Sequence, residues 1–156
     1  MKHLIFNTTN NWAATILRIT LGSTILIHGV GKLSPEGYNE FIYFFTEYLK
    51  MPVFLGWMTI SIETLGSLLL IIGLATRINA TMLFGLFTGM IVFVHWEVGF
   101  SMNWWGQLDA GQEGFEYHLL VLAMSTAIAF LGGGAYSADR HFFSQASNHQ
   151  LSVSEK

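Results

Sequence analysis

The stretch WAATILRITLGSTILIHGVGKL, residues 12–33, decides the fold class of this chain. It is almost entirely apolar and is long enough to cross a bilayer, because about 20 helical residues span ~30 Å of hydrocarbon. Ionisable residues interrupt it at Arg18, His28 and Lys32. A charged group at membrane depth is costly, so each of these side chains needs a partner or water. The fold must therefore supply those partners from other segments.

The composition of the whole chain points to an integral membrane protein. Of its 156 residues, 52% are hydrophobic and 11% are charged, whereas a soluble domain has about 25% charged residues. The net charge of −3 provides no basic patch for nucleic acid. Cysteine is absent, which excludes thiol–disulfide exchange and thiolate metal sites. Any redox role must therefore use a quinone, a haem, a metal or a partner protein.

Apolar segments of spanning length occur at four places, residues 12–33, 53–74, 78–96 and 115–134. This pattern predicts an all-α fold, an integral membrane four-helix bundle that occupies residues 1–143 as a single domain. The first span is expected to be retained, because it is too long for a secretory signal and has no small-x-small cleavage site. The polar tail, residues 144–156, is predicted to be disordered.

An amphipathic helix is predicted between the first two spans, over residues 36–50. Ser34 and Pro35 supply a cap and a first-turn proline. Glutamates and Lys50 occupy one side of this helix, and aromatic residues occupy the other. The segment is too polar to cross the bilayer, so we expect it to lie in the membrane interface. The alternative is a soluble helix packed on the bundle.

The distribution of Lys and Arg predicts that both termini face the cytoplasm. Arg77 and Arg140 lie on the side of the termini, whereas the long loop after Glu97 contains no Lys or Arg. Trp104 and Trp105 in that loop suit an aromatic belt at the outer interface. Residues at the loop side of the spans are therefore expected to face outward.

Depth along the helices predicts an ion pair between Arg18 and Glu63. At ~1.5 Å per residue, each residue lies about 15 Å below the outer boundary of its span. Opposite charges at one depth are expected to pair, and breaking a buried pair costs ~3–5 kcal/mol. One interpretation is a structural lock between the spans. The other is a role in binding a polar headgroup or relaying protons.

A second polar group is expected where the first and third spans end and the fourth begins, at His28, Lys32, His95, Glu97, Glu116 and His118. Imidazoles in this position could ligate a metal, hold a haem edge or hydrogen-bond a quinone carbonyl. Residues two apart on a helix point about 200° apart, so His95 and Glu97 cannot both face one ligand. Solvated helix ends are the alternative.

We predict a cofactor-binding site for a quinone rather than for haem or a metal, formed by His28, Lys32, His95, Glu116 and His118. No metal site is predicted, and no catalytic residue is assigned.

Small residues on the polar faces favour close packing of the helices. Gly22 and Gly29 share a helix face with Arg18, and Gly66 shares one with Glu63. Small residues let membrane helices approach closely. These faces are therefore expected to meet in the interior of the bundle.

Four short motifs occur in order over about residues 12–140. The first two are Leu17-Arg18 with Gly22 and then His28-Gly29-Val30-Gly31-Lys32-Leu33. The third is Glu63 with Gly66 and Gly73 ahead of Arg77 and Ala80, and the fourth is Gly132-Gly133-Gly134-Ala135-Tyr136-Ser137-Ala138-Asp139-Arg140. In this combination the sequence resembles the DoxX family of small four-span membrane proteins. The resemblance implies a four-helix bundle in the bacterial inner membrane. It also implies an association with quinone-linked oxidoreductase complexes, but it carries over no set of catalytic residues.

Two functions of different classes are therefore predicted. The first is a membrane subunit associated with quinone-linked oxidoreductase chemistry, in which His28 and His118 hydrogen-bond a quinone carbonyl and Glu116 accepts a proton. The second is a non-catalytic scaffold or accessory subunit of a larger membrane complex, docked through the 36–50 helix. A transporter is disfavoured because the sequence has no inverted repeat. The expected partners are membrane lipid and other membrane subunits or further copies of the chain, with no nucleic acid.

Overall fold

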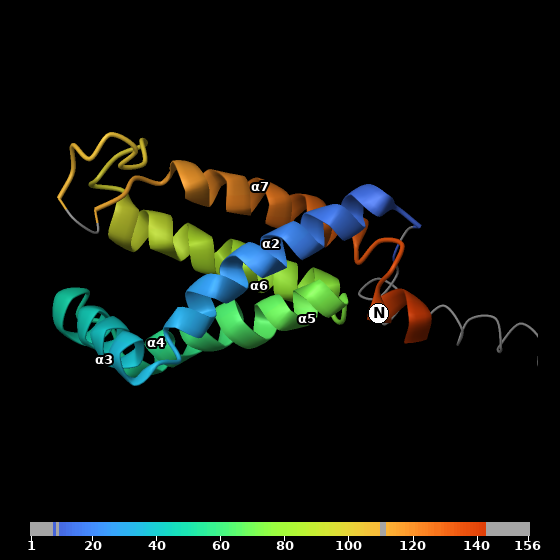
Figure 1. Cartoon of the computed structure of the whole chain (residues 1–156), viewed down its shortest axis with the longest axis horizontal. Helices are drawn as coiled ribbons and strands as arrows, with labels where there is room; N and C mark the ends of the chain where they lie inside the picture. The colour runs from blue at the N-terminus through green and yellow to red at the C-terminus, as the bar shows by residue number, and fades with distance from the viewer. Residues whose placement is uncertain (1–7, 9, 110–111, 143–156) are drawn as a thin grey trace, which may run out of the picture.

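The computed structural model describes residue 8, residues 10–109 and residues 112–142. Within these ranges the secondary structure is helical and contains no strand. Figure 1 shows long helices lying side by side, with the loop 96–115 and the short helix α3 at one end and the start of α2 at the other. We call these the loop end and the terminal end.

Three helical rods are long and apolar enough to cross a membrane. They are α2 (Trp12–Gly31), the continuous rod of α4 (Val53–Ser61), η2 (Ile62–Gly66) and α5 (Ser67–Ile72), and the rod of α6 (Thr76–Met90) and η3 (Ile91–His95). The elements η2 and η3 are π-helical turns. A fourth apolar helix, α7 (Glu116–Leu131), is shorter, at 16 residues. The all-helical membrane class is confirmed, and a bundle that crosses the membrane four times stays a prediction.

The ends of the rods follow local sequence signals. Asn11 caps α2, because its side chain accepts a hydrogen bond from the Ala13 amide at 2.8 Å. Gly73 ends α5 with a left-handed φ of 78°, a conformation that glycine adopts without steric cost. Ala75 also has a positive φ, of 50°, which costs a residue with a Cβ about 1–2 kcal/mol. The turn between the second and third rods is therefore tight and needs support from elsewhere.

Close backbone packing brings α2 against the second rod. A Cβ at Gly22 would lie 3.0 Å from the Ser67 carbonyl oxygen, and one at Gly29 would lie 2.7 Å from the Glu63 carbonyl carbon. The small residues therefore do meet between helices, as predicted. Apolar side chains fill the space around them, including Leu21, Ile25, Leu70, Leu83, Phe87, Val121 and Ile128.

The predicted pair between Arg18 and Glu63 is wrong, because the register of the two rods differs from the prediction. Glu63 lies level with Gly29, near the loop end of α2, whereas Arg18 lies level with Gly73 at the terminal end. The two charged residues are thus separated along the rod by ten residues, or ~15 Å. The prediction set the ends of both spans at one depth, but α4 begins well beyond the end of α2.

The helix α3 (Pro35–Tyr43) and the turn η1 (Phe44–Tyr48) form an arm at the loop end. None of its residues is buried. It rests on α4, where Trp57 Nε1 donates to the Tyr38 hydroxyl at 2.8 Å and Ile42 packs against Gly56. A helix therefore exists where one was predicted over residues 36–50, and its place in the membrane interface stays a prediction.

Candidate functional site

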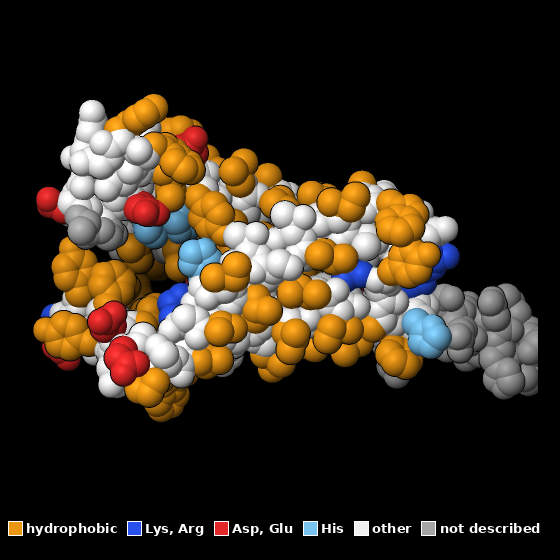
Figure 2. All heavy atoms as spheres, in the orientation of Figure 1, with side chains coloured by type: hydrophobic (Ala, Val, Ile, Leu, Met, Phe, Trp, Pro, Cys, Tyr) orange, Lys and Arg blue, Asp and Glu red, His pale blue; other side chains and the backbone are white. Residues whose placement is uncertain are grey.

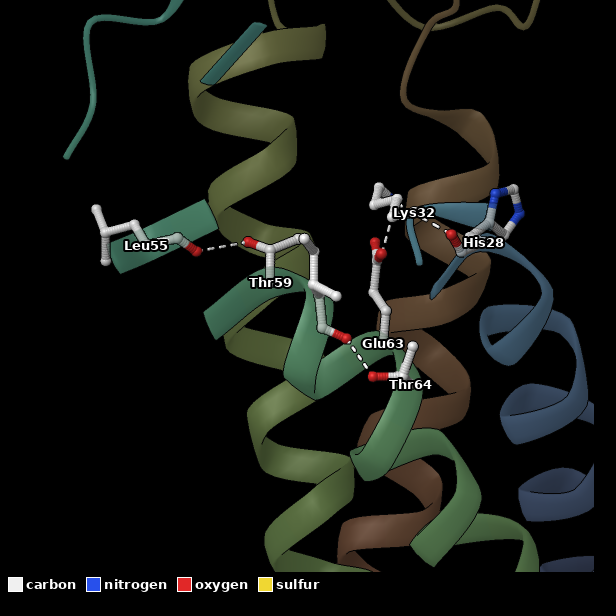
Figure 3. A network of polar contacts seen from close by, with 7 residues as sticks. His28, Lys32, Leu55, Thr59, Glu63 and Thr64 are labelled. Atoms are coloured by element: carbon white, nitrogen blue, oxygen red, sulfur yellow. Dashed lines mark hydrogen bonds and ion pairs between the residues drawn. The ribbon is translucent and has the colours of Figure 1, made fainter. Parts of the chain in front are cut away.

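An ion pair between a buried glutamate and a partly exposed lysine lies at the loop end of the helices. Lys32 Nζ is 2.5 Å from Glu63 Oε2, and the two side chains are 19% and 1% exposed. Lys32 also donates to the His28 carbonyl at 3.5 Å, and its Nζ lies 5.0 Å from the centre of the Phe41 ring. Figure 3 shows Glu63 pointing from its helix toward Lys32 at the end of α2. Glu63 is therefore neutralised by a residue of the predicted outer cluster and not by Arg18.

Two residues of the site lie in π-helical turns, Glu63 in η2 and His95 in η3. A π-helical turn adds a residue to the α-helical ladder, which changes the direction of the side chains, and such turns are frequent at functional sites. In η2, the Thr64 hydroxyl donates to the Ile60 carbonyl at 2.5 Å (Figure 3). The turns therefore help to aim Glu63 and His95 toward the other helices.

Four ring side chains form a continuous row next to the ion pair, and we call it the ring row: His28, Tyr117, His118 and His95. The ring centres are 6.2 Å apart between His28 and Tyr117 and 4.2 Å apart between His118 and His95. Tyr117 and His118 are 5.8 Å apart, and Phe87 packs against both rings. The structure thus brings three predicted histidines together and adds Tyr117, which the sequence analysis did not single out.

Two polar atoms of the ring row are buried without a hydrogen-bond partner among the described residues, the Tyr117 hydroxyl and His118 Nδ1. Leaving such a group unsatisfied costs ~1–3 kcal/mol, and native proteins usually satisfy it with water or a ligand. The Tyr117 ring is 6.2 Å from the His28 ring, and the His28 carbonyl accepts a hydrogen bond from Lys32. These two polar atoms with unused hydrogen-bonding capacity therefore lie close to the Lys32–Glu63 pair.

The surface at the loop end is hollowed next to this site. Figure 2 shows histidine and cationic side chains at the base of a recess between two lobes, with acidic side chains on both lobes. In Figure 1 the two lobes correspond to the arm formed by α3 and to the loop 96–115. The ring row is therefore close to an opening at this end of the molecule.

Glu116 lies apart from the ring row and serves the loop 96–115. Its Oε2 accepts hydrogen bonds from Trp104 Nε1 at 3.2 Å and from the Met102 amide at 3.4 Å. Glu116 also lines a pocket within this loop, together with residues such as Trp105 and Leu108. Glu116 and His118 thus point in different directions, as their spacing predicts. The remaining acid of the predicted group, Glu97, is exposed.

Arg18 is satisfied at the terminal end by backbone carbonyl groups. Its Nε donates to Gly133 at 2.7 Å, and its Nη1 donates to Leu70 at 3.2 Å and to Ile71. Its Nη2 donates to Tyr136. A cation at the carbonyl end of a helix is favourable for the helix dipole. Arg18 therefore caps α5 and at the same time holds the glycine-rich segment after α7.

Asp139 supports the tight turn that precedes α6. Its buried carboxylate accepts hydrogen bonds from the Ala75 amide at 2.7 Å and the Thr76 amide at 2.9 Å. This capping offsets the strain of the positive φ at Ala75. Nearby, Arg77 Nη1 donates to the Ala129 carbonyl at 2.7 Å. The charged motif residues thus separate into a structural set at the terminal end and the Lys32–Glu63 pair at the loop end.

The described residues contain no group of three or more His, Cys, Asp or Glu side chains that could hold a metal ion.

Comparison with known proteins identifies the family. The model of the DoxX family matches residues 13–96, which include both charged residues of the ion pair. This chain belongs to the DoxX family. A curated relative from Bacillus subtilis (strain 168), named "Putative oxidoreductase CatD", is 28% identical over 138 residues, which are 88% of this chain and 92% of the relative. No solved structure matches the chain. The DoxX match ends before α7, so Tyr117 and His118 lie outside it.

Proposed function

We propose that this DoxX-family protein is a membrane subunit of an oxidoreductase system and that its loop end binds the headgroup of a quinone. The association with oxidoreductase function is supported by the relative from Bacillus subtilis, which is named as an oxidoreductase. The observation that supports a headgroup site is a pair of buried polar atoms near the Lys32–Glu63 pair, the Tyr117 hydroxyl and His118 Nδ1, which have no hydrogen-bond partner in the described part of the chain.

The chemistry of these residues fits a quinone. A quinone offers flat apolar faces and carbonyl oxygens that only accept hydrogen bonds. The Tyr117 hydroxyl can donate to one carbonyl, and His118 Nδ1 can donate in the tautomer that protonates it. Phe87 supplies an aromatic surface next to both donors. His28 lies at the exposed edge of the site, and Lys32 places a cation near the headgroup without net charge, because Glu63 neutralises it.

In this proposal the three long rods and the shorter helix α7 all cross the bacterial inner membrane, with both termini in the cytoplasm. The loop end then faces outward, and the arm formed by α3 lies in the outer interface. The helix α7 is shorter than the three rods, but the loop 96–115 precedes it directly. This loop is rich in the tryptophans typical of a membrane interface, so the loop and α7 together support this placement. The headgroup site is then within reach of a quinone dissolved in the membrane.

The test is binding of a decyl-tailed benzoquinone to the purified protein in lipid nanodiscs. Wild-type protein is expected to gain thermal stability as the quinone concentration rises, because a ligand that binds only the folded state stabilises it. Tyr117→Phe is expected to fold normally, because it removes an unpartnered hydroxyl, and to bind the quinone about tenfold more weakly, since one hydrogen bond is lost. The matched control is Tyr43→Phe on the exposed arm. A wild-type protein without a shift, or equal shifts in wild type and Tyr117→Phe, contradicts the proposal.

A second function is that of a non-catalytic accessory subunit. The observation that favours it is the exposed surface of the arm formed by α3 and η1. None of the residues of α3 and η1 is buried, although several are aromatic. A photoreactive amino acid at Tyr43 would cross-link to a partner subunit in native membranes if the arm docks there. Cross-linking to lipid alone would contradict docking and favour the interfacial placement.

A further inference from the structure

We infer that His118 and His95 form a proton path that connects the headgroup site to the aqueous side of the loop end. The inference rests on the proposed function, because it assigns a role to the same site. It starts from the contact between the two imidazoles, whose ring centres are 4.2 Å apart. His118 is buried on α7, whereas His95 on η3 is partly exposed. The two rings therefore lead from the interior to the surface without another side chain between them.

The chemistry of a quinone requires such a path. Reduction of a quinone adds two electrons and two protons and forms two O–H bonds, one on each oxygen. The electrons would come from a flavin- or haem-bearing partner of the oxidoreductase system, and the protons must come from water. A site within packed helices receives protons quickly only through groups that can accept and release them. Imidazole is the side chain best suited to this task near neutral pH.

The hydrogen bond of His95 fixes which of its nitrogens can exchange a proton. His95 Nδ1 is 2.6 Å from the Glu113 carbonyl oxygen. Since a carbonyl only accepts, Nδ1 must carry the hydrogen. The neutral ring then has its lone pair on Nε2, so this one nitrogen takes a proton from water and gives it to the free ring nitrogen of His118. His118 then releases the hydrogen carried by Nδ1, an atom that lacks a partner within the described part of the chain, to a bound headgroup and returns to the neutral form.

The side chains around His118 and His95 do not offer a competing route for the proton. On the side of α2 and η2, Lys32 and Glu63 neutralise each other at 2.5 Å. On α6, Phe87 is apolar and packs at 5.4 Å from the His118 ring. His28 is the remaining imidazole of the ring row, and the Tyr117 ring, whose phenol is a far weaker acid than an imidazolium, lies between it and His118. The short contact with His95 is therefore the most direct exit from His118.

The test is voltammetry of the full chain in a tethered bilayer on an electrode, loaded to saturation with decyl-tailed benzoquinone. The electrode supplies the two electrons and the buffer supplies the two protons. We expect His95→Gln to slow the coupled reduction by about 10²-fold, the lower range for loss of a positioned proton-transfer group. The glutamine amide keeps the hydrogen bond to Glu113 but cannot relay a proton. His141→Gln, which removes an exposed imidazole at the terminal end by the same substitution, is the matched control and is expected to reduce the quinone at the wild-type rate.

The possible outcomes distinguish failure of the proton path from failure of the headgroup site. Slow reduction in His95→Gln that is restored by added imidazole supports the path, since a structural role would not respond to imidazole. Slow reduction without rescue, or an unchanged rate in His95→Gln, overturns the path and leaves the headgroup site standing. A wild-type film with no bound quinone overturns both. Reduction of the wild type is also expected to be slower in D₂O, and equal rates in D₂O and H₂O overturn the path without any variant.

Discussion

At the scale of single residues, Glu63 determines the stability of the loop end. It is 1% exposed, so its charge depends on Lys32 at 2.5 Å. Glu63→Gln is expected to lower the free energy of unfolding by about 3 kcal/mol, because it leaves Lys32 without a counter-charge. The measurement is thermal or denaturant unfolding in a mild detergent. The control is Glu47→Gln, which removes an exposed pair with Lys50 at 3.4 Å and is expected to cost at most about 1 kcal/mol. Equal losses would contradict the assignment.

Arg18 has a structural role that lysine cannot fill. Its guanidinium donates to carbonyls of α5 and of the segment after α7 at the same time. Lysine carries the charge but lacks the planar fork of donors. Arg18→Lys is therefore expected to cost about 2 kcal/mol of unfolding free energy, since buried carbonyls lose their donor. Arg140→Lys, at a half-buried position of the same end, should cost less. An Arg18→Lys protein as stable as Arg140→Lys would contradict this role.

The residues that needed partners could be predicted from the sequence, but the partners could not. An arginine inside an apolar run requires compensation, yet the groups that compensate Arg18 are backbone carbonyls, which every residue carries. Glu63 was expected to pair with Arg18, the opposite charge that was assumed to lie at the same depth. The observed register of the helices places Glu63 beside Lys32 instead. Tyr117 was missed because a tyrosine at the start of a span reads as an interfacial residue, and only the structure shows that its hydroxyl is buried without a partner in the described region.

At the scale of helices, the contact between α2 and η2 sets the geometry of the site. Gly29 lets the two backbones touch, because a Cβ there would lie 2.7 Å from the Glu63 carbonyl carbon. Gly29→Ala is expected to cost about 1–3 kcal/mol through overpacking and to weaken quinone binding by moving Glu63. Gly31→Ala, two residues along the same helix, meets nothing within 4 Å and should be neutral or slightly stabilising. Unfolding of both variants under one set of conditions is the measurement, and equal destabilisation would contradict the contact.

The helix positions followed from hydrophobic runs and from the residues that interrupt them. The second span was predicted at 53–74 and the helical rod covers Val53–Ile72, since Pro52 and Gly73 limit it on either side. The third was predicted to begin at residue 78 and begins at Thr76, because Asp139 caps it from a distant part of the chain. The π-helical turns gave no signal in the sequence, since they depend on packing between helices.

At the scale of the whole molecule, the placement of the two ends across the membrane can be tested cleanly, because the chain has no cysteine. Gln107→Cys lies in the loop end and Asn10→Cys lies at the terminal end, and both positions are exposed. In intact cells, a membrane-impermeant maleimide is expected to label Gln107→Cys but to label Asn10→Cys only after permeabilisation. The loop carries no Lys or Arg, which is typical of a translocated segment. The reverse labelling pattern would invert the proposed orientation and place the quinone site on the cytoplasmic side.

The hydrogen bonds that Arg18 donates to the segment after α7 have a consequence for the order of events during synthesis. The Gly133 carbonyl that receives the guanidinium lies 115 residues further along the chain, so it leaves the ribosome roughly 6–23 s later at ~5–20 residues per second. Until then the guanidinium has only the Leu70 and Ile71 carbonyls of the second rod as acceptors at its final depth. Its Nε and Nη2 donors must be satisfied by lipid phosphates or water until the last segment supplies the Gly133 and Tyr136 carbonyls. A ribosome stalled before that segment should therefore hold α2 in a less firmly fixed, still movable state.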